Sequence, residues 1–261
     1  MAYRPIEEVE KILDETGLEQ STPQSITDRD IYMSELEKTR ARGFAATSGD
    51  LMLGLSAVSS PIFDKQKELA SALVVKGSQA RMPNSIISKI IDDNGPIDIL
   101  INNAANDQRH TTDDVDEKYW DNRMGINLKH FFFTIKAVKD GMIKKGSGSI
   151  VNLGSVSWML GEGDKVAYET AKSAVVGLTR SFAKELGKHN IRANSVVPGS
   201  IATERQIKHW LTPEYKKWLL DKQCLKRQLK PSDVSSLVLY LASDVSSGCT
   251  KQNFIVDAGI T

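Results

Sequence analysis

At residues 148–155 the chain reads Gly148-Ser149-Ile150-Val151-Asn152-Leu153-Gly154-Ser155, an apolar strand that ends on a serine. Thirteen residues after that serine begins the run Tyr168-Glu169-Thr170-Ala171-Lys172. Residues four apart share one face of a helix, so the Lys172 ammonium can sit beside the Tyr168 ring. A nearby cation lowers the pKa of a phenol from about 10. This spacing predicts Tyr168 as a general acid/base, with Ser155 holding the oxygen of a substrate hydroxyl.

Taken singly, these residues have more ordinary interpretations. A half-buried tyrosine beside a solvated lysine is the common case for Tyr-x-x-x-Lys. Ser155 also suits a hydroxyl that caps a strand end, and Asn127 a buried side chain that forms a turn. Further blocks favour the catalytic interpretation, because they surround the pair in a defined order and spacing. They are Asp98-Ile99-Leu100-Ile101-Asn102-Asn103-Ala104-Ala105, Trp120 to Asn127-Leu128, and Ile191-Arg192-Ala193-Asn194-Ser195-Val196-Val197-Pro198-Gly199 with Thr203.

From about Asn94 to the C-terminus, the blocks together resemble the short-chain dehydrogenase/reductase family, with Ala105 where that family usually has glycine. The resemblance implies an α/β fold with a parallel, Rossmann-like sheet flanked by helices. The expected strands lie at about 97–102, 149–153, 192–197 and 253–256, and the expected long helices at 116–144 and 167–188.

The same resemblance implies an oxidoreductase that uses NAD or NADP. The carbon-bound hydrogen of the substrate then leaves as hydride to the nicotinamide. Lys172 would also bond the nicotinamide ribose, and Asn127 would fix a water that relays the proton. The implied catalytic residues are Asn127, Ser155, Tyr168 and Lys172. The implied cofactor contacts are Asn102, Ala104, Tyr168, Lys172, Pro198, Gly199 and Thr203.

Three stretches resemble the sugar-oxidising members of that family, such as aldose 1-dehydrogenases of the xylose type: residues 103–110, 155–158 and 224–226. We expect a small-molecule substrate, with an aldose as one candidate. Asn106 would contact it at the C-terminal end of the sheet, where such folds bind ligands, together with Asp107, Arg109 and His110. Trp158 would present an apolar face to a sugar ring, although simple packing is its more common role.

The glycine-rich unit that opens a dinucleotide-binding fold is missing upstream of Asn102. Such a fold begins with a strand, a glycine-rich turn and a helix whose N-terminus receives the pyrophosphate. The glycines of this region form neither Gly-x-x-x-Gly-x-Gly nor Gly-x-Gly-x-x-Gly; they are Gly17, Gly43, Gly49, Gly54, Gly77 and Gly95. We therefore expect poor affinity for NAD or NADP despite the catalytic set.

An α+β segment takes the place of that unit. Apolar residues at helical spacing predict a helix from Ile6 to Glu15 that stops at Gly17. A capping-box pattern predicts a second helix from Ser34 to Gly43. The remaining expected elements are an antiparallel hairpin of residues 51–63 with 69–75 and a short helix over 84–91.

Residues 1 to about 84 resemble the effector-binding domain of IclR-type transcriptional regulators. The matching text includes Glu35-Leu36-Glu37-Lys38-Thr39-Arg40-Ala41-Arg42-Gly43-Phe44-Ala45 and Gly54-Leu55-Ser56-Ala57-Val58-Ser59-Ser60-Pro61-Ile62-Phe63-Asp64. In that family the second stretch lines a ligand pocket, which implies contacts for Ser56, Ser59 and Ser60; small residues of a buried strand are an equal alternative. We expect a regulator-like part over 1–90 joined to a dehydrogenase-like part over 91–261.

Three functions remain open from the sequence. The first is a dehydrogenase acting on a hydroxyl of a sugar or similar polyol. The second is a chimeric or truncated protein that keeps the catalytic residues but has little cofactor binding or activity. The third is a ligand-sensing module derived from a regulator.

Composition limits partners and location. With 261 residues and a formal net charge of +1, the chain has no basic footprint for nucleic acid. No apolar run is long enough to cross a membrane. Cys224 and Cys249 have neither metal-like nor paired spacing, which suits the cytoplasm and predicts no metal site. The resemblance also implies a homodimer or homotetramer that uses the two long helices, with Phe131, Phe132 and Phe133 among their outer residues.

Overall fold

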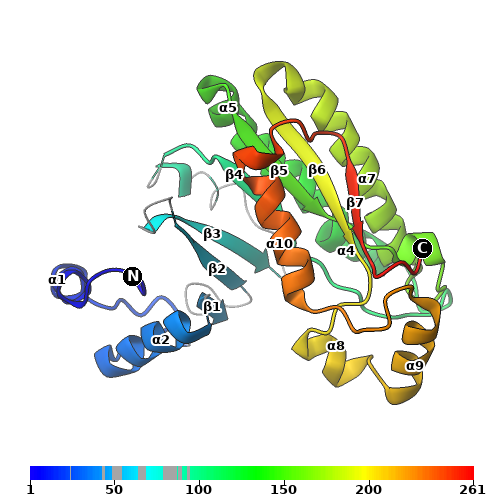
Figure 1. The fold of residues 1–261 in the computed structure, drawn as a ribbon, viewed down its shortest axis with the longest axis horizontal. Helices are drawn as coiled ribbons and strands as arrows, with labels where there is room; N and C mark the ends of the chain where they lie inside the picture. Colours follow the sequence, from blue (N-terminus) through cyan, green and yellow to red (C-terminus); the bar gives the residue numbers. More distant parts are fainter. Residues whose placement is uncertain are drawn as a thin grey trace. The chain divides into compact units, whose positions relative to one another are not determined.

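The computed structural model describes residues 1–23, 25–42, 45–48, 55–63, 69–78, 87, 90–92 and 95–261. The chain divides into two compact units, Met1–Ala80 and Arg81–Thr261. Each unit has its own sheet, one antiparallel and one parallel (Figure 1).

The first unit has two helices and a three-stranded antiparallel sheet in the order β1-β2-β3. Its elements are α1 (Ile6–Thr16), α2 (Arg29–Arg42), β1 (Ala45–Ser48), β2 (Leu55–Phe63) and β3 (Leu69–Ser78). The pairing of β2 with β3 confirms the expected hairpin. Strand β1, which pairs with β2, was not expected. The side chains of Ser56, Ser59 and Ser60 lie outside the described residues, so their implied ligand contacts stay a prediction.

Helix α1 follows its predicted bounds, whereas α2 begins five residues before the predicted Ser34. The earlier start follows from Asp28, whose carboxylate accepts a hydrogen bond from the Ile31 amide at 2.9 Å and so caps the first turn. Val9 and Leu13 of α1 are buried in a small core completed by Ala2 and Leu36. The short helix expected over 84–91 lies mostly outside the described residues.

The second unit is a parallel sheet in the order β4-β5-β6-β7 with helices between successive strands. Its strands are β4 (Ile99–Asn102), β5 (Gly148–Leu153), β6 (Ile191–Pro198) and β7 (Asn253–Val256). Its helices are α4 (Glu117–Met124), η1 (Gly125–Lys129), α5 (His130–Lys145), α6 (Ser157–Leu160), α7 (Val166–Leu186), η2 (Gly187–His189), α8 (Glu204–His209), α9 (Pro213–Lys222), α10 (Pro231–Ala242) and η3 (Asp244–Ser246). The four predicted strands are confirmed to within two residues at each end.

Helices cover both faces of this parallel sheet. Successive side chains of a strand point to opposite faces. On β5, the Ser149 hydroxyl donates to the Leu241 carbonyl of α10 at 2.8 Å. The next residue, Ile150, packs with α5 and α7 on the other face. The two faces of β5 are therefore covered by different helices, as in the expected Rossmann-like architecture.

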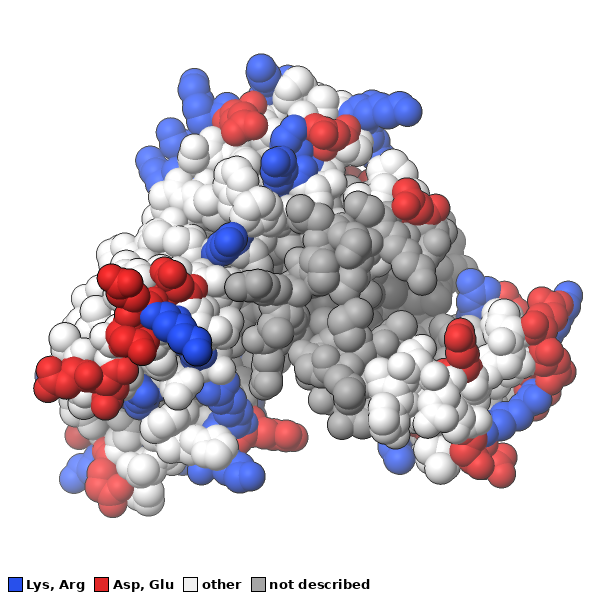
Figure 2. Space-filling view, turned by 180° about the vertical axis from the view of Figure 1, so that it is seen from behind, with Lys and Arg blue, Asp and Glu red and all other residues white. Residues whose placement is uncertain are grey.

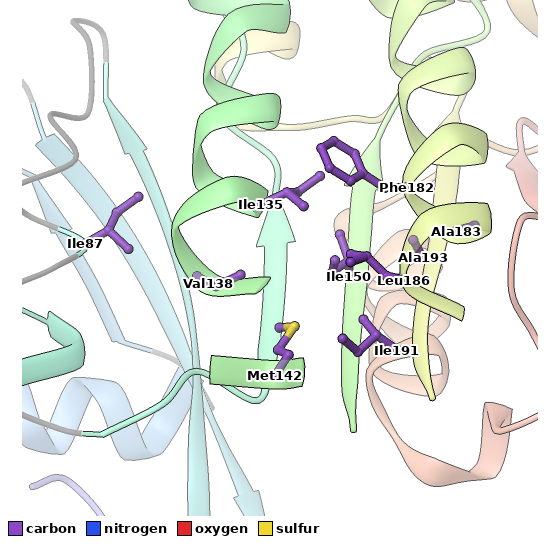
Figure 3. Packing of buried hydrophobic residues seen from close by; sticks show 10 residues of the cluster. All are labelled: Ile87, Ile135, Val138, Met142, Ile150, Phe182, Ala183, Leu186, Ile191 and Ala193. Atoms are coloured by element: carbon purple, nitrogen blue, oxygen red, sulfur yellow. The ribbon is translucent and has the colours of Figure 1, made fainter. Parts of the chain in front are cut away.

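The main core lies between the sheet and helices α5 and α7. Figure 3 shows side chains of the two helices converging over β5 and β6. Leu186 at the end of α7 and Met142 near the end of α5 are both buried there. The buried members of the cluster are Ile87, Ile135, Val138, Met142, Ile150, Phe182, Ala183, Leu186, Ile191 and Ala193.

One expected interface residue belongs to the interior instead. Phe131 is 0% exposed in the second unit, so it is not an outer residue of α5. It lies on the sheet-facing stripe of the helix with Ile135 and Val138, at helical spacing. Phe132 is 43% exposed and remains available to a partner subunit.

Charges of both signs stand side by side on the described surface in Figure 2. No helix among the described residues is long and apolar enough to span a membrane. Within the same residues, no group of three or more His, Cys, Asp or Glu side chains could hold a metal ion.

Candidate active site

A cavity of about 320 Å³ lies where segments leave the C-terminal ends of β4, β5 and β6. This edge of a parallel sheet is where α/β folds bind ligands. The cavity is lined by Asn103, Ala105, Asp107, Arg109, Ser155, Val156, Ser157, Leu160, Glu162, Lys165, Tyr168, Gly199, Ser200, Ile201, Thr203, Arg205, Gln206, Tyr215, Leu219 and Ile260.

Ser155 and Tyr168 meet at this cavity. Ser155 follows the end of β5, and Tyr168 lies in the first turn of α7. Both side chains line the cavity, and the Ser155 hydroxyl is near enough to Tyr168 to lower the pKa of its phenol. The Ser155 hydroxyl also donates to Ser157 Oγ at 3.0 Å and accepts from the Ser157 amide at 3.2 Å. A hydroxyl or carbonyl oxygen bound here would lie within reach of both side chains.

Lys172 lies one turn beyond Tyr168 and is 1% exposed. Its ammonium donates to the Leu153 carbonyl at 2.6 Å and lies 5.7 Å from the centre of the Tyr168 ring. Burial lowers the pKa of Lys172 to about 7, because the interior disfavours the charged amine. Lys172 is therefore buried beside Tyr168. The more ordinary interpretation, a lysine exposed to solvent, is wrong.

The pKa of Tyr168 moves in the direction opposite to the one expected from the sequence. Burial raises it above the ordinary value, and the nearby Ser155 hydroxyl opposes that rise only in part. Lys172 is a weak counter-charge, because its own pKa is lowered to about 7. The expectation that Lys172 lowers the pKa of Tyr168 is therefore wrong for this structure, in which the protonated phenol is favoured.

Asn127 lies in the π-helical turn η1, between α4 and α5, and is 0% exposed. Its side-chain oxygen accepts from the Asn106 amide at 2.8 Å, and its side-chain nitrogen donates to the Asn106 carbonyl at 3.1 Å. Such π-turns within helices often mark functional sites. Asn127 thus anchors the loop that follows β4 and borders the cavity.

Several predicted contacts do not line the cavity. Asn102 belongs to a buried chain of hydrogen bonds, accepting from Thr134 Oγ1 at 2.8 Å and donating to Asn152 Oδ1 at 2.9 Å. Asn106 is engaged with Asn127 through its backbone. The other predicted residues absent from the lining are Ala104, His110, Asn127, Trp158, Lys172 and Pro198. The predicted residues that are part of it are Asp107, Arg109, Ser155, Tyr168, Gly199 and Thr203.

Sequence analysis missed ten residues of the cavity wall, and the charged or large polar ones among them are Glu162, Lys165, Arg205, Gln206 and Tyr215. For two of these five residues, their position in the sequence could have indicated the site. Glu162 and Lys165 lie between Ser155 and Tyr168 in the chain, so their segment must pass the site. The other three belong to α8 and α9, where no local pattern marks a residue as facing a cavity.

The residues present fit the nicotinamide half of a dinucleotide. Tyr168 and Ser155 supply hydroxyls, and Lys172 has three N–H donors, of which the Leu153 carbonyl takes one. Gly199 also lines the cavity, and its missing side chain lets the Asp257 backbone pack against it, because a Cβ there would lie 2.9 Å from the Asp257 Cα. A glycine-rich turn for the pyrophosphate is not found in the sequence upstream of Asn102.

Comparison with known proteins gives two family matches. A family model described as enoyl-(acyl carrier protein) reductase matches residues 67–261. The model of the bacterial transcriptional regulator IclR C-terminal domain matches residues 1–92.

Individual relatives match the dehydrogenase-like part. D-xylose 1-dehydrogenase of Caulobacter vibrioides is 47% identical over 173 residues, which are 66% of this chain and 69% of that protein. "Probable galactose dehydrogenase GalD" of Rhizobium meliloti is 44% identical over 64% of this chain and 65% of its own length. The crystal structure of gluconate 5-dehydrogenase from Burkholderia cenocepacia J2315, in complex with NADP and tartrate, is 29% identical with a TM-score of 0.64, over 68% of this chain and 69% of that one.

One assignment follows from the parallel sheet, from the arrangement of Ser155, Tyr168 and Lys172, and from these matches. The chain belongs to the short-chain dehydrogenase/reductase family. Its first 92 residues carry the additional match to the IclR C-terminal domain.

Proposed function

We propose that the chain is an NAD(P)-dependent oxidoreductase that interconverts a hydroxyl and a carbonyl group on a sugar or related polyol. The observation that carries this proposal is the placement of Ser155 and Tyr168 on the wall of one cavity, with Lys172 buried one turn beyond Tyr168. The similarity to D-xylose 1-dehydrogenase and galactose dehydrogenase supports a sugar as substrate.

Each residue of the set has a defined task in this proposal. Ser155 holds the substrate oxygen by a hydrogen bond. Tyr168 gives a proton to that oxygen during carbonyl reduction and takes it back during alcohol oxidation. A bound nicotinamide supplies or accepts the hydride at the substrate carbon. Lys172 orders the site through Leu153, and Asn127 fixes the loop after β4 through Asn106.

The protonation state of Tyr168 favours one direction in the free protein. Burial raises its pKa, so the phenol keeps its proton at neutral pH. A protonated phenol is ready to act as the acid in carbonyl reduction. Alcohol oxidation needs the phenolate, and its rate is therefore expected to increase with pH.

Further assignments belong to the same proposal. We assign the regulator-like part to residues 1–90 and the catalytic part to 91–261. The protein acts in the cytoplasm as a homodimer or homotetramer, and it binds no nucleic acid. The match of residues 1–92 to the IclR C-terminal domain favours a second candidate function, which is the sensing of a small ligand by that segment.

The test is a turnover assay in both directions with NAD(H) and NADP(H) at millimolar concentration. Tyr168→Phe removes the transferable proton with little change of shape, and it should lower turnover about 10²- to 10⁴-fold. Tyr240→Phe is the matched control, because Tyr240 lies on α10 and does not line the cavity. Equal turnover of wild type and Tyr168→Phe would contradict the proposed role of this tyrosine.

Absence of turnover in the wild type at saturating cofactor would favour the alternative of a chain with little activity. Isothermal titration calorimetry of the same sample with NAD and NADP separates weak cofactor binding from a failure of the chemistry.

A further inference from the structure

The cavity beside Ser155 and Tyr168 has several charged side chains in its wall. Three cations line it: Arg109, Lys165 and Arg205. Two carboxylates line it as well, those of Asp107 and Glu162. Whether these charged groups are paired within the protein or free to bind a ligand decides which substrates the cavity accepts.

Each of the three lining cations is paired with a carboxylate within the described residues 95–261. Arg109 pairs with Asp164. Lys165 pairs with Glu162 and also reaches Asp164 at 3.2 Å. Arg205 pairs with Asp107 at 3.0 Å. The guanidinium and ammonium groups are therefore already neutralised by the protein itself.

The pair of Lys165 and Glu162 is the most sheltered of the three. Their side chains are 6% and 19% exposed. Solvent and salt screen such a pair far less than a surface pair. Glu162 also accepts a hydrogen bond from the Tyr215 hydroxyl at 3.4 Å. A second carboxylate near Lys165 would have to lie against Glu162, where like charges repel.

The wall nevertheless keeps many hydrogen-bonding groups. Asp107 accepts from Gln206 Nε2 at 2.7 Å in addition to Arg205, so its two oxygens are held in fixed positions. Each carboxylate oxygen has a further lone pair, and each cation has further N–H donors. A polyol hydroxyl both donates and accepts, so it can bond to either side of these pairs without separating them.

From this pairing we infer that the cavity selects uncharged polyols and discriminates against sugar acids. Glu162 is the principal specificity-determining residue, because it occupies the cation that a substrate carboxylate would need. Asp107 acts in the same way on Arg205. This inference rests on the proposed function, since it concerns the substrate of the same site.

The test is equilibrium binding of D-xylose and D-xylonate to the full chain, measured by ligand-observed NMR titration at pH 7.5. The two probes differ in one carboxylate and in the ring that D-xylose closes; the ring contributes equally in wild type and variants, so a change of preference in a variant reports the charge. Neither readout depends on turnover. The wild type should bind D-xylose more tightly than D-xylonate. Glu162→Gln should raise the affinity for D-xylonate relative to D-xylose by about tenfold, because it removes the nearer of the two carboxylates that hold Lys165 and with it a charge that repels the substrate carboxylate.

Two further variants sharpen the experiment. Glu185→Gln changes the same charge at an exposed position of α7 outside the cavity lining, and it should leave the preference unchanged. Asp107→Asn should shift the preference in the same direction as Glu162→Gln. It replaces Glu162→Gln in the experiment if Glu162→Gln does not fold.

The outcomes separate this inference from the proposed function. Equal or tighter binding of D-xylonate by the wild type overturns the inference while leaving a sugar site in place. An unchanged preference in both cavity variants overturns it as well. Binding of neither compound overturns both the inference and the proposed sugar substrate.

Discussion

Lys172 donates a hydrogen bond from Nζ to the main-chain oxygen of Leu153 at 2.6 Å, from a position that is almost closed to solvent. Burial lowers the pKa of this amine from 10.5 to about 7. Between those values the unfolded chain holds a proton that the folded chain has released. The free energy of unfolding therefore rises as the pH increases through that window. Below about pH 7 the folded protein bears the full cost of burying the charged amine.

Lys172→Met removes this titration while keeping a long side chain in the same space. We expect the stability of the wild type relative to the variant to rise between pH 7 and pH 10 by up to roughly 4 kcal/mol, since one pKa unit corresponds to about 1.4 kcal/mol. Urea unfolding at several pH values measures this difference. Lys184→Met, at an exposed position of the same helix, is the control and should show no such trend. A constant difference would show that Lys172 stays charged in the fold.

Tyr168 should remain a phenol in the free protein well above neutral pH. Burial raises its pKa, and the nearby Lys172 is too weakly charged to reverse this. A difference titration of wild type against Tyr168→Phe, followed at the absorbance of tyrosinate, isolates this one group. We expect no tyrosinate signal from Tyr168 below pH 10. A signal that titrates between pH 7 and pH 8 would instead support the original expectation that Lys172 lowers the pKa of the phenol.

Asn127→Ala should loosen the loop that follows β4. The Asn127 side chain bonds the backbone of Asn106 twice and is completely buried. Its removal leaves two partly buried backbone groups of Asn106 without this partner, which costs about 1–3 kcal/mol. Urea unfolding gives the loss, and hydrogen exchange at the Asn106 amide should accelerate. Asp121→Ala changes an exposed side chain on α4, and its effect should stay within about 0.5 kcal/mol.

His110 ties the same loop to the start of α7. The Ala167 amide donates to its Nε2 at 3.3 Å, and its Nδ1 lies 3.0 Å from the Tyr119 hydroxyl. An imidazole nitrogen that accepts a hydrogen bond carries no hydrogen itself, so only another group with a lone pair can replace Nε2 as the acceptor. His110→Leu should therefore destabilise the first turn of α7, whereas His110→Gln should recover part of the loss through its amide oxygen. Hydrogen exchange of the Ala167 amide measures both effects; equal exchange in the two variants would contradict this role.

The parallel sheet could be predicted from the sequence because each strand is a short apolar run at a familiar spacing. β7 matched its predicted bounds, and β5 differed by one residue at its start. The beginning of α2 was missed because one capping carboxylate, Asp28, outweighs the weaker pattern at Ser34. Phe131 was misplaced because three successive phenylalanines do not reveal by themselves which one faces the sheet.

The cavity wall was only partly predictable, for a physical reason. Ser155 and Tyr168 belong to consecutive elements with characteristic spacing. The bond between Gln206 and Asp107, by contrast, joins residues 99 positions apart. No sequence period connects them, because the contact depends on how α8 returns toward the loop after β4. Pairings of this kind set the charge of the cavity and can be seen only once the chain is folded.

The last prediction concerns the cofactor, because the sequence upstream of Asn102 contains no glycine-rich turn for the pyrophosphate. Hydrogen bonds to a charged group contribute about 1.5–3 kcal/mol each, so the loss of two weakens binding roughly 10²- to 10⁴-fold. Replacing residues 1 to about 90 with the strand, glycine-rich turn and helix of a family member should therefore tighten NAD or NADP binding by that factor and raise sugar turnover with it. Calorimetric titration of both proteins with both cofactors makes the comparison, and the same replacement carrying Tyr168→Phe should bind cofactor but not turn over. Micromolar affinity of the unmodified chain would overturn the prediction, since the regulator-like segment would then have to provide a phosphate site of its own.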